Sequence, residues 1–209
     1  MSAPIHGLPL GGVLVGGRSS RFGSDKAAAM VGGRSMAARA VDTLRAVADP
    51  VVLLGGDGAL GRRLALPWRA DDRSGRGPLS GLATGLRWAG ELGLRGLFVL
   101  ACDLPLVTRE VVDAVAAQIR PDLDAVVVAA GEPAGVQPLC GWYATGTLAA
   151  VEIALDRGRH SARELLSGLR IALVRVDGTT PERRLALLNV NTRDDLAEAI
   201  RYASTEHPS

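Results

Sequence analysis

The sequence is poor in aromatic residues, cysteine and histidine, and each shortage excludes a class of protein. Phenylalanine, tryptophan and tyrosine make up 3% of the 209 residues, so the core must be filled by alanine, valine and leucine. Cys102 and Cys140 are too few for a disulfide framework, and each lies in an apolar run, which favours reduced, buried thiols. The three histidines (His6, His160 and His207) are scattered, so no histidine metal cluster or serine–histidine–aspartate arrangement is predicted.

Long apolar runs and a large excess of one charge are also missing. No stretch approaches the roughly 20 apolar residues that cross a bilayer, and no basic, then hydrophobic, leader begins the chain. We therefore expect a cytoplasmic protein that binds no membrane. The 24 basic and 22 acidic residues leave a net charge of +2, which predicts no nucleic-acid partner and a local anion site. The length fits one domain over residues 1–209, with a core of about 8–203.

Apolar runs and helical patterns alternate along the first two thirds of the chain. Strands are expected at Leu10–Val15, Val51–Leu54, Leu97–Ala101 and Ala125–Ala130. Helices are expected from Ser35 to about Val47, from about Leu79 to Leu92, and after a Thr108 cap through Val111, Val112, Val115 and Ile119. Continuous runs such as Val126–Val128 fit strands covered on both faces. The alternation predicts an α/β fold: a three-layer α/β/α Rossmann-like arrangement with a mostly parallel sheet.

The last third of the sequence is less regular. We expect a strand around Leu139–Tyr143, a helix at Gly146–Leu155, a strand at Ile171–Val176 and a helix opened by Thr192. Ser161 and Glu164 have the spacing of a capping box, in which hydroxyl and carboxylate satisfy amides at a helix start.

A glycine-rich, basic loop over residues 16–26 follows the first predicted strand. Glycines let a backbone approach an anion closely, while Arg18, Arg21 and Lys26 supply positive charge, so this composition is typical of a phosphate site. The spacing matches neither a P-loop nor a dinucleotide-binding fingerprint. The alternative is a surface loop with solvated arginines.

Polar residues also follow other predicted strands, where ligands sit in open α/β sheets. Asp103 ends the run at residues 97–101, and its carboxylate suits Mg²⁺, which prefers one or two carboxylates plus phosphate oxygens. Its alternative role is to cap the following turn. Asp71 opens a polar, glycine-rich crossing that could line a base pocket or be an ordinary loop. Asn189 and Asn191 form a third polar segment.

Four motifs, in order, resemble the molybdenum cofactor guanylyltransferase family over about Leu10–Ile200. They are Leu14-Val15-Gly16-Gly17-x-x-x-Arg21-Phe22-Gly23-x-Asp25-Lys26, Gly77-Pro78-Leu79-Ser80-Gly81, Cys102-Asp103-Leu104-Pro105 and Asn189-Val190-Asn191-Thr192. The resemblance implies a nucleotidyltransferase that joins GMP from GTP to the terminal phosphate of the molybdopterin cofactor and releases pyrophosphate, with Mg²⁺ required. It also implies cofactor-accepting apo-enzymes as partners.

Roles are carried over by motif. The resemblance implies nucleotide contacts for Leu14, Val15, Gly16 and Gly17, a phosphate contact for Lys26, a guanosine contact for Asp71, and GTP and magnesium binding for Asp103. Lys26, Asp103 and Arg21 are the expected catalytic residues, with Arg21 and Lys26 offsetting charge on the leaving pyrophosphate. Asn191 is an expected polar contact to metal-bound phosphate, and Asn189 a lesser one. The pterin side is expected around residues 137–139 and 159–163.

Three departures from the family pattern keep alternatives open. Val15 stands where the family usually has alanine, Phe22 where it has methionine, and the nucleotide-contacting asparagine is absent around Gly55 and Gly56. A cytidylyltransferase for the same cofactor, or a sugar-phosphate nucleotidyltransferase, is therefore a second hypothesis. A third is a non-catalytic nucleotide-binding module that delivers the cofactor to an apo-enzyme.

Overall fold

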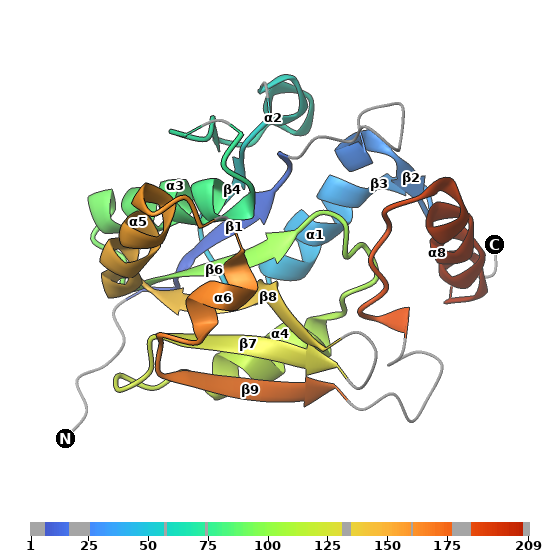
Figure 1. Ribbon diagram of the computed structural model, residues 1–209. Helices are drawn as coiled ribbons and strands as arrows, with labels where there is room; N and C mark the ends of the chain where they lie inside the picture. Colours follow the sequence, from blue (N-terminus) through green and yellow to red (C-terminus); the bar gives the residue numbers. More distant parts are fainter. Residues whose placement is uncertain are drawn as a thin grey trace.

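A seven-stranded sheet forms the centre of the molecule (Figure 1). The computed structural model describes residues 7–16, 26–56, 58–73, 75–130, 135–159, 161–176 and 185–206. The sheet order is β5-β4-β1-β6-β8-β7-β9. Its strands are β1 (Leu10–Leu14), β4 (Val51–Leu54), β5 (Trp68–Arg69), β6 (Gly96–Ala101), β7 (Ala125–Ala130), β8 (Val136–Ala144) and β9 (Ile171–Val176).

All strands except β8 run in the same direction. β1 pairs in parallel with β4 and β6, β4 with β5, and β7 with β9, whereas β8 is antiparallel to both β6 and β7. The expected mostly parallel α/β fold is therefore confirmed. β8 begins at Val136, three residues before the predicted start, and its antiparallel direction follows from the short connection of residues 131–135, which is too short for a parallel crossover.

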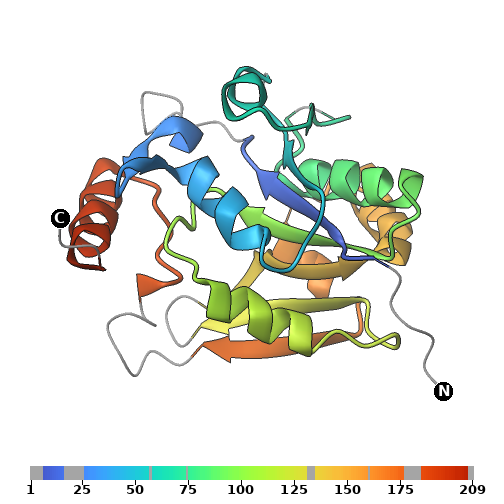
Figure 2. The same cartoon turned by 180° about the vertical axis from the view of Figure 1, so that it is seen from behind.

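Helices cover both faces of the sheet, as Figures 1 and 2 show from opposite sides. The described helices are η1 (Lys26–Ala28), α1 (Met36–Leu44), α2 (Ala59–Leu64), α3 (Pro78–Glu91), α4 (Arg109–Ala117), η2 (Thr145–Thr147), α5 (Leu148–Asp156), α6 (Ala162–Leu166) and α8 (Arg193–Glu206). Side chains of α1 and α4 share one apolar core with the sheet, and those of α3, α5 and α6 share another. The two cores are built mostly from leucine, valine and alanine, as the shortage of aromatic residues requires.

Local capping explains where several helices begin. The Ser35 hydroxyl accepts a hydrogen bond from the Ala38 amide at 3.2 Å, and the Ser161 hydroxyl accepts one from the Glu164 amide at 3.2 Å. Thr108 stands at the N-cap of α4, where the sequence predicted it, but its side chain makes no capping hydrogen bond. The Thr108 hydroxyl instead bonds the Glu110 carboxyl and lowers the pKa of that group.

A short hairpin was not predicted from the sequence. β2 (Met30–Val31) and β3 (Arg34–Ser35) are antiparallel and joined by Gly32 and Gly33, both with positive φ. Two glycines are a known signal for such a turn, but two-residue strands leave no periodicity to detect. The hairpin matters because Val31 packs with Met36, Val190 and Ala199 in a third apolar cluster, which holds α8 against the rest of the fold.

The two cysteines are buried and form no disulfide. Cys140 lies in β8, where burial raises the pKa of its thiol to about 12, so the thiolate is suppressed. Among the helices of the described residues, none combines the length and apolar character that crossing a membrane requires.

Gly141 of β8 generates a stability prediction. It pairs with Val127, next to a shift in the β7–β8 register, and a β-carbon there would lie 2.8 Å from Val127 Cα. Because that neighbour is backbone and cannot rotate away, we expect Gly141→Ala to lower the free energy of unfolding by about 1–3 kcal/mol. Equilibrium urea unfolding measures the effect. The matched control is Gly146→Ala, where no atom lies within 4 Å of the added carbon; equal losses in both variants would refute the packing argument.

Candidate active site

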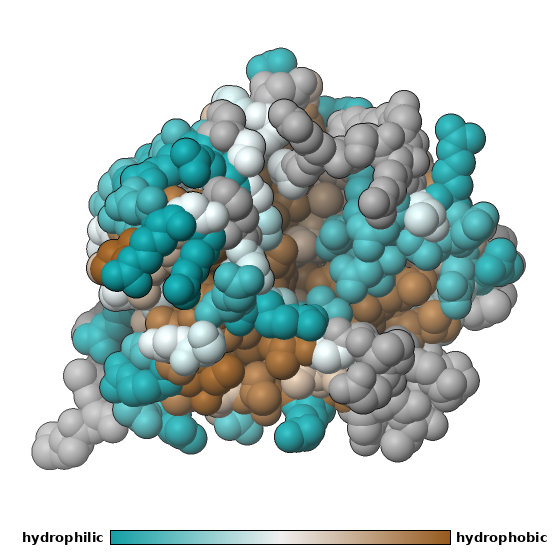
Figure 3. Space-filling model, viewed as in Figure 1, coloured by the Kyte–Doolittle hydropathy of each residue, from teal (hydrophilic) through white to brown (hydrophobic). Residues whose placement is uncertain are grey.

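Four adjacent parallel strands end at the same edge of the sheet, and each is followed by a residue singled out from the sequence. Gly16 follows β1, Gly55 follows β4, Asp71 follows β5, and Asp103 follows β6. The chain leaves β1 toward β4 on one side and returns to β6 on the other, which makes the β1–β6 boundary the switch point of the sheet. The surface is hollowed over the ends of these strands (Figure 3).

Lys26 joins two of the predicted polar segments. Its ammonium nitrogen lies 3.4 Å from Asp103 Oδ2 and donates a hydrogen bond to Asn191 Oδ1 at 2.9 Å. The Lys26 side chain is 14% exposed and that of Asp103 30%, so solvent screens this contact only in part. Three residues separated by up to 165 positions thus meet at the β1–β6 boundary.

Lys26 is the only lysine in the sequence, and the other 23 of its 24 basic residues are arginine. Lysine presents a compact ammonium with three donors, whereas arginine presents a broad, planar fork. The ammonium fits between a carboxylate and an amide oxygen, which is where a bound phosphate would compete for it. The single lysine among 23 arginines favours a compact cationic group at this position.

Asn191 is held by the start of α8. The Asp195 carboxylate accepts hydrogen bonds from the amides of Asn191 and Thr192, both at 2.8 Å, and the Asp195 amide donates to the Thr192 hydroxyl at 3.1 Å. The predicted Thr192 cap is thus confirmed as half of a reciprocal box. The Asn191 amide is the largest influence that lowers the pKa of Asp195, and the charge of Lys26 adds to it.

The backbone beside Asp103 is fixed from two directions. The Val190 amide donates to the Asp103 carbonyl at 2.8 Å, which ties the segment of Asn189 and Asn191 to the end of β6. From α1, Arg39 Nε donates to the Pro105 carbonyl at 2.7 Å. Asp103 is therefore placed by backbone contacts and leaves its carboxylate free to face Lys26.

Asp71 lies in a cradle of three glycines. Its Oδ1 atom is buried and has no hydrogen-bond partner among the described residues. A β-carbon at Gly55 would lie 3.2 Å from this oxygen, one at Gly81 3.3 Å from it, and one at Gly16 3.5 Å from Oδ2. Burial raises the pKa of Asp71. An unpaired, buried carboxylate oxygen is costly, so a donor that reached this oxygen would be bound favourably.

Leu14 and Val15 reach the site mainly through their backbone. The Leu14 side chain is buried against α3, while its carbonyl accepts a hydrogen bond from the Cys102 amide at 3.1 Å. The Val15 amide donates to the Leu54 carbonyl at 2.9 Å, and its side chain packs against the core. Gly17 and Arg21 lie outside the described residues, as does most of the loop over residues 16–26.

The donor set fits magnesium better than a metal held by protein ligands alone. The described residues hold no cluster of three or more histidine, cysteine, aspartate or glutamate side chains. Asp103 and Asn191 offer oxygens only, which suits Mg²⁺ completed by phosphate and water.

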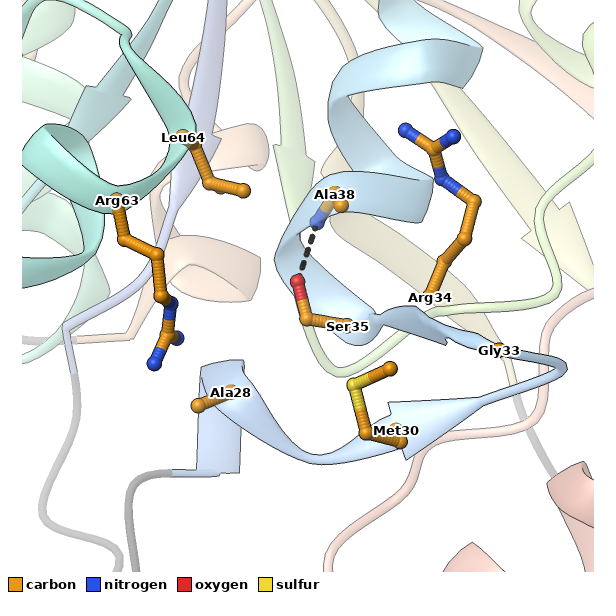
Figure 4. Close-up of a pocket in the computed structure, with 8 residues that line it drawn as sticks. All are labelled: Ala28, Met30, Gly33, Arg34, Ser35, Ala38, Arg63 and Leu64. Carbon is orange, nitrogen blue, oxygen red and sulfur yellow. Dashed lines mark hydrogen bonds between the residues drawn. The ribbon is translucent and has the colours of Figure 1, made fainter.

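A second concavity, a groove of about 430 Å³, lies on the far side of η1. Its eight described lining residues come from η1, the β2–β3 hairpin, α1 and α2 (Figure 4). Arg63 extends toward Ala28, and Arg34 pairs with Asp42 at 2.6 Å. Without a carboxylate or side-chain amide in its lining, the groove offers no counterpart to the Asp103 centre.

Three residues that support this site without facing it were not predicted from the sequence: Asp195, Ser80 and Thr84. Asp195 could have been predicted, because Thr192 and Asp195 have the spacing of a capping box, with aspartate in place of the usual glutamate or glutamine. Ser80 and Thr84 had no such signal: their hydroxyls bond the backbone just after Asp71, and nothing in α3 alone indicates that partner.

Known proteins resemble this chain over most of its length. A family model described as the MobA-like NTP transferase domain matches residues 11–176. A molybdenum cofactor guanylyltransferase of Desulfosudis oleivorans is 32% identical over 193 residues, which cover 90% of this chain and 92% of that protein. A probable molybdenum cofactor guanylyltransferase of Opitutus terrae is 34% identical over 197 residues, which cover 93% of this chain and 96% of that protein.

A solved structure supports the fold independently. The crystal structure of molybdopterin-guanine dinucleotide biosynthesis protein A from Archaeoglobus fulgidus superposes with a TM-score of 0.72 at 22% identity, over 94% of this chain and 99% of that one.

Asp195 generates a prediction for α8. We expect Asp195→Ala to lower the free energy of unfolding by about 1 kcal/mol at neutral pH, because two backbone amides lose their acceptor. The folded-state pKa is lowered, so the contribution is complete well above the usual value of 3.8 and disappears as the pH falls through the folded pKa. Urea unfolding at several pH values measures it. Asp194→Ala, in the same helical turn, is the control; a difference that persists at low pH would contradict the carboxylate's role.

Proposed function

Because the chain belongs to the family defined by the MobA-like NTP transferase domain, we propose that it is a molybdenum cofactor guanylyltransferase. It transfers GMP from GTP to the terminal phosphate of the molybdopterin cofactor and releases pyrophosphate. The observation that carries the proposal is the contact of Lys26 with Asp103 and Asn191 at the switch point of the sheet. This is where a triphosphate and a second anion can be held together.

The reaction joins two anions. An oxygen of the acceptor phosphate forms a bond to the α-phosphorus of GTP, and the bond from that phosphorus to the oxygen bridging to the β-phosphate breaks. A phosphate is already ionised at neutral pH, so no general base is needed. Catalysis then consists mainly of alignment and neutralisation of charge.

Lys26 supplies positive charge at the phosphates and passes from its protein partners to phosphate oxygens when GTP binds. Asp103, with Asn191 beside it, would hold Mg²⁺. Bound there, Mg²⁺ would neutralise phosphate charge, which a lone carboxylate cannot do. Arg21 and the amides of Gly16 and Gly17 complete the proposal as the groups that orient the leaving pyrophosphate.

Asp71 is proposed to read the base. A carboxylate accepts hydrogen bonds only, and guanine presents two donors side by side, the N1–H and the 2-amino group. Cytosine presents an acceptor, N3, in the corresponding position and would meet the carboxylate with a mismatch. The unpaired Oδ1 of Asp71 therefore favours guanine, although glycines replace the family's asparagine near residues 55 and 56.

The setting of the reaction completes the proposal. We place it in the cytoplasm, where buried thiols that form no disulfide, such as those of Cys102 and Cys140, stay reduced. The product passes to cofactor-accepting apo-enzymes, and the whole catalytic unit is one domain.

The Lys26–Asp103 pair generates the main test. We expect Asp103→Ala to abolish GMP transfer, and Lys26→Ala to raise the KM for GTP and lower kcat together, by about 10²–10³-fold in kcat/KM, because each removes charge that faces the phosphates. Release of pyrophosphate from GTP, with purified molybdopterin and Mg²⁺, measures this.

The matched control for that test is the exposed pair Arg109 and Asp113 of α4, at 3.2 Å. Arg109→Ala and Asp113→Ala should leave turnover unchanged. Undiminished turnover in Asp103→Ala would end the proposed role of that residue, and unchanged kcat/KM in Lys26→Ala would end that of the lysine.

Base recognition by Asp71 should depend on pH. Inosine triphosphate lacks the 2-amino group, so the ratio of its Kd to that of GTP reports the Asp71 contact while phosphate titration cancels. Because burial raises the pKa of Asp71, we expect the ratio to fall with falling pH, starting above the usual value of 3.8. Calorimetric titration between about pH 8 and about pH 4.5 tests this. In Asp71→Asn, the ratio of the two Kd values should be low and independent of pH. If the ratio in the unaltered protein stayed high at every pH, the Asp71 contact would be refuted.

A further inference from the structure

Two hydroxyl side chains are buried one turn apart on α3. Ser80 is 1% exposed and Thr84 2% exposed, and with Thr147 they are the buried polar side chains of the described residues. A buried hydroxyl costs free energy unless it is hydrogen-bonded, and alanine or valine would pack at these positions without that cost. Their partners should therefore reveal what the hydroxyls do.

Both hydroxyls bond the backbone that follows Asp71. The Ser80 hydroxyl accepts a hydrogen bond from the Arg73 amide at 3.2 Å and donates one to the Arg73 carbonyl at 2.8 Å. The Thr84 hydroxyl accepts from the Asp72 amide at 3.3 Å and donates to the Ser80 carbonyl at 3.0 Å. The two residues after Asp71 are thus both attached to α3.

On the other side of Asp71, the backbone of Arg69 is attached to the sheet. The Arg69 carbonyl accepts a hydrogen bond from the Gly55 amide at 2.9 Å, at the end of the β4–β5 ladder. Asp71 therefore bridges two rigid elements, with the sheet behind it and α3 ahead of it. Gly81, beside Ser80, has no side chain and so leaves the space that the Asp71 carboxylate occupies.

Ion pairs near the loop are a weaker anchor. Arg87 pairs with Asp72 and with Glu152, and Arg73 pairs with Asp156 at 2.5 Å, but all of these side chains are more than a third exposed. Exposed pairs contribute little and are screened by salt. The buried hydroxyls are left as the groups that fix the backbone immediately after Asp71.

We propose that Ser80 and Thr84 are positioning residues for base discrimination: they hold the Asp71 carboxylate where it can accept both guanine donors. The inference rests on the proposed function, in which Asp71 reads the base. Two parallel hydrogen bonds to one carboxylate are sensitive to its orientation. A loop freed from α3 still binds the triphosphate through the Lys26 side of the site, but it tells guanine from hypoxanthine less well.

The experiment compares two buried threonines whose hydroxyls bond different parts of the backbone. Thr84→Val removes the hydroxyl and keeps the shape, and Thr84→Ser restores the hydroxyl. Thr147→Val is the matched control, because the Thr147 hydroxyl is equally buried but donates to the Asp124 carbonyl at 3.0 Å, before β7. The readout is the ratio of Kd for inosine triphosphate to Kd for GTP, with the full chain at a temperature where every variant is folded.

We expect Thr84→Val and Ser80→Ala to lower this ratio about tenfold, toward that of Asp71→Asn, the effect of losing one buried hydrogen bond. Thr84→Ser should keep the ratio, and Thr147→Val should keep it despite a comparable loss of stability. In kinetics, Thr84→Val should raise the KM for GTP more than it lowers kcat.

The outcomes separate the two proposals. If Asp71→Asn lowers the ratio and Thr84→Val does not, the positioning role is overturned while Asp71 remains the base reader. If Asp71→Asn leaves the ratio unchanged, the base contact of the proposed function fails and takes the inference with it. If Thr147→Val lowers the ratio as much as Thr84→Val, the effect is general destabilisation and the positioning role is overturned.

Discussion

The balance of charge around one ammonium group organises the candidate site. Lys26 contacts both Asp103 and Asn191, and under the proposed function it would turn to phosphate oxygens when a nucleotide binds. A partly buried ion pair allows both, because the Asp103 carboxylate offsets the ammonium charge while the remaining exposure of the Lys26 side chain keeps it accessible. The architecture around it serves this balance: β6 delivers the carboxylate, α8 delivers the amide, and backbone bonds fix both.

The same logic, rigid backbone with few polar side chains, applies to Asp71. Parallel strands buried on both faces have no room for polar groups, which are displaced to the carboxyl edge. There Gly16 and Gly55, after β1 and β4, and Gly81 of α3 let the backbone approach one carboxylate, and that carboxylate is left with an unsatisfied oxygen. An unpaired buried acceptor costs stability, and a ligand donor removes that cost. Under the proposed function, binding of the base would therefore relieve a cost that the protein carries at Asp71.

The sequence predicted the parts of the fold that have strong local signals. Buried runs such as Val51–Leu54 and Ala125–Ala130 were placed within a residue, and the caps at Ser35 and Thr192 were correct. The β2–β3 hairpin could not be predicted, because two-residue strands have no period. The direction of β8 was not predicted either, although the connection after β7 is too short for a parallel crossover. Thr108 shows the limit of capping rules: the right residue at the right position can bond a neighbouring carboxyl instead.

For the site, residue type and position after a strand were enough to select Lys26, Asp71 and Asp103, but not to say how they are held. The meeting of Lys26 with Asn191 joins positions 165 residues apart, and only the folded chain brings them together. Ser80 and Thr84 are harder still, because a serine and a threonine on a helix have many possible partners and their own spacing does not say which. Charged residues at the end of a strand can be recognised by residue type, whereas residues that support them are recognised only from the backbone groups to which they hydrogen-bond in the structure.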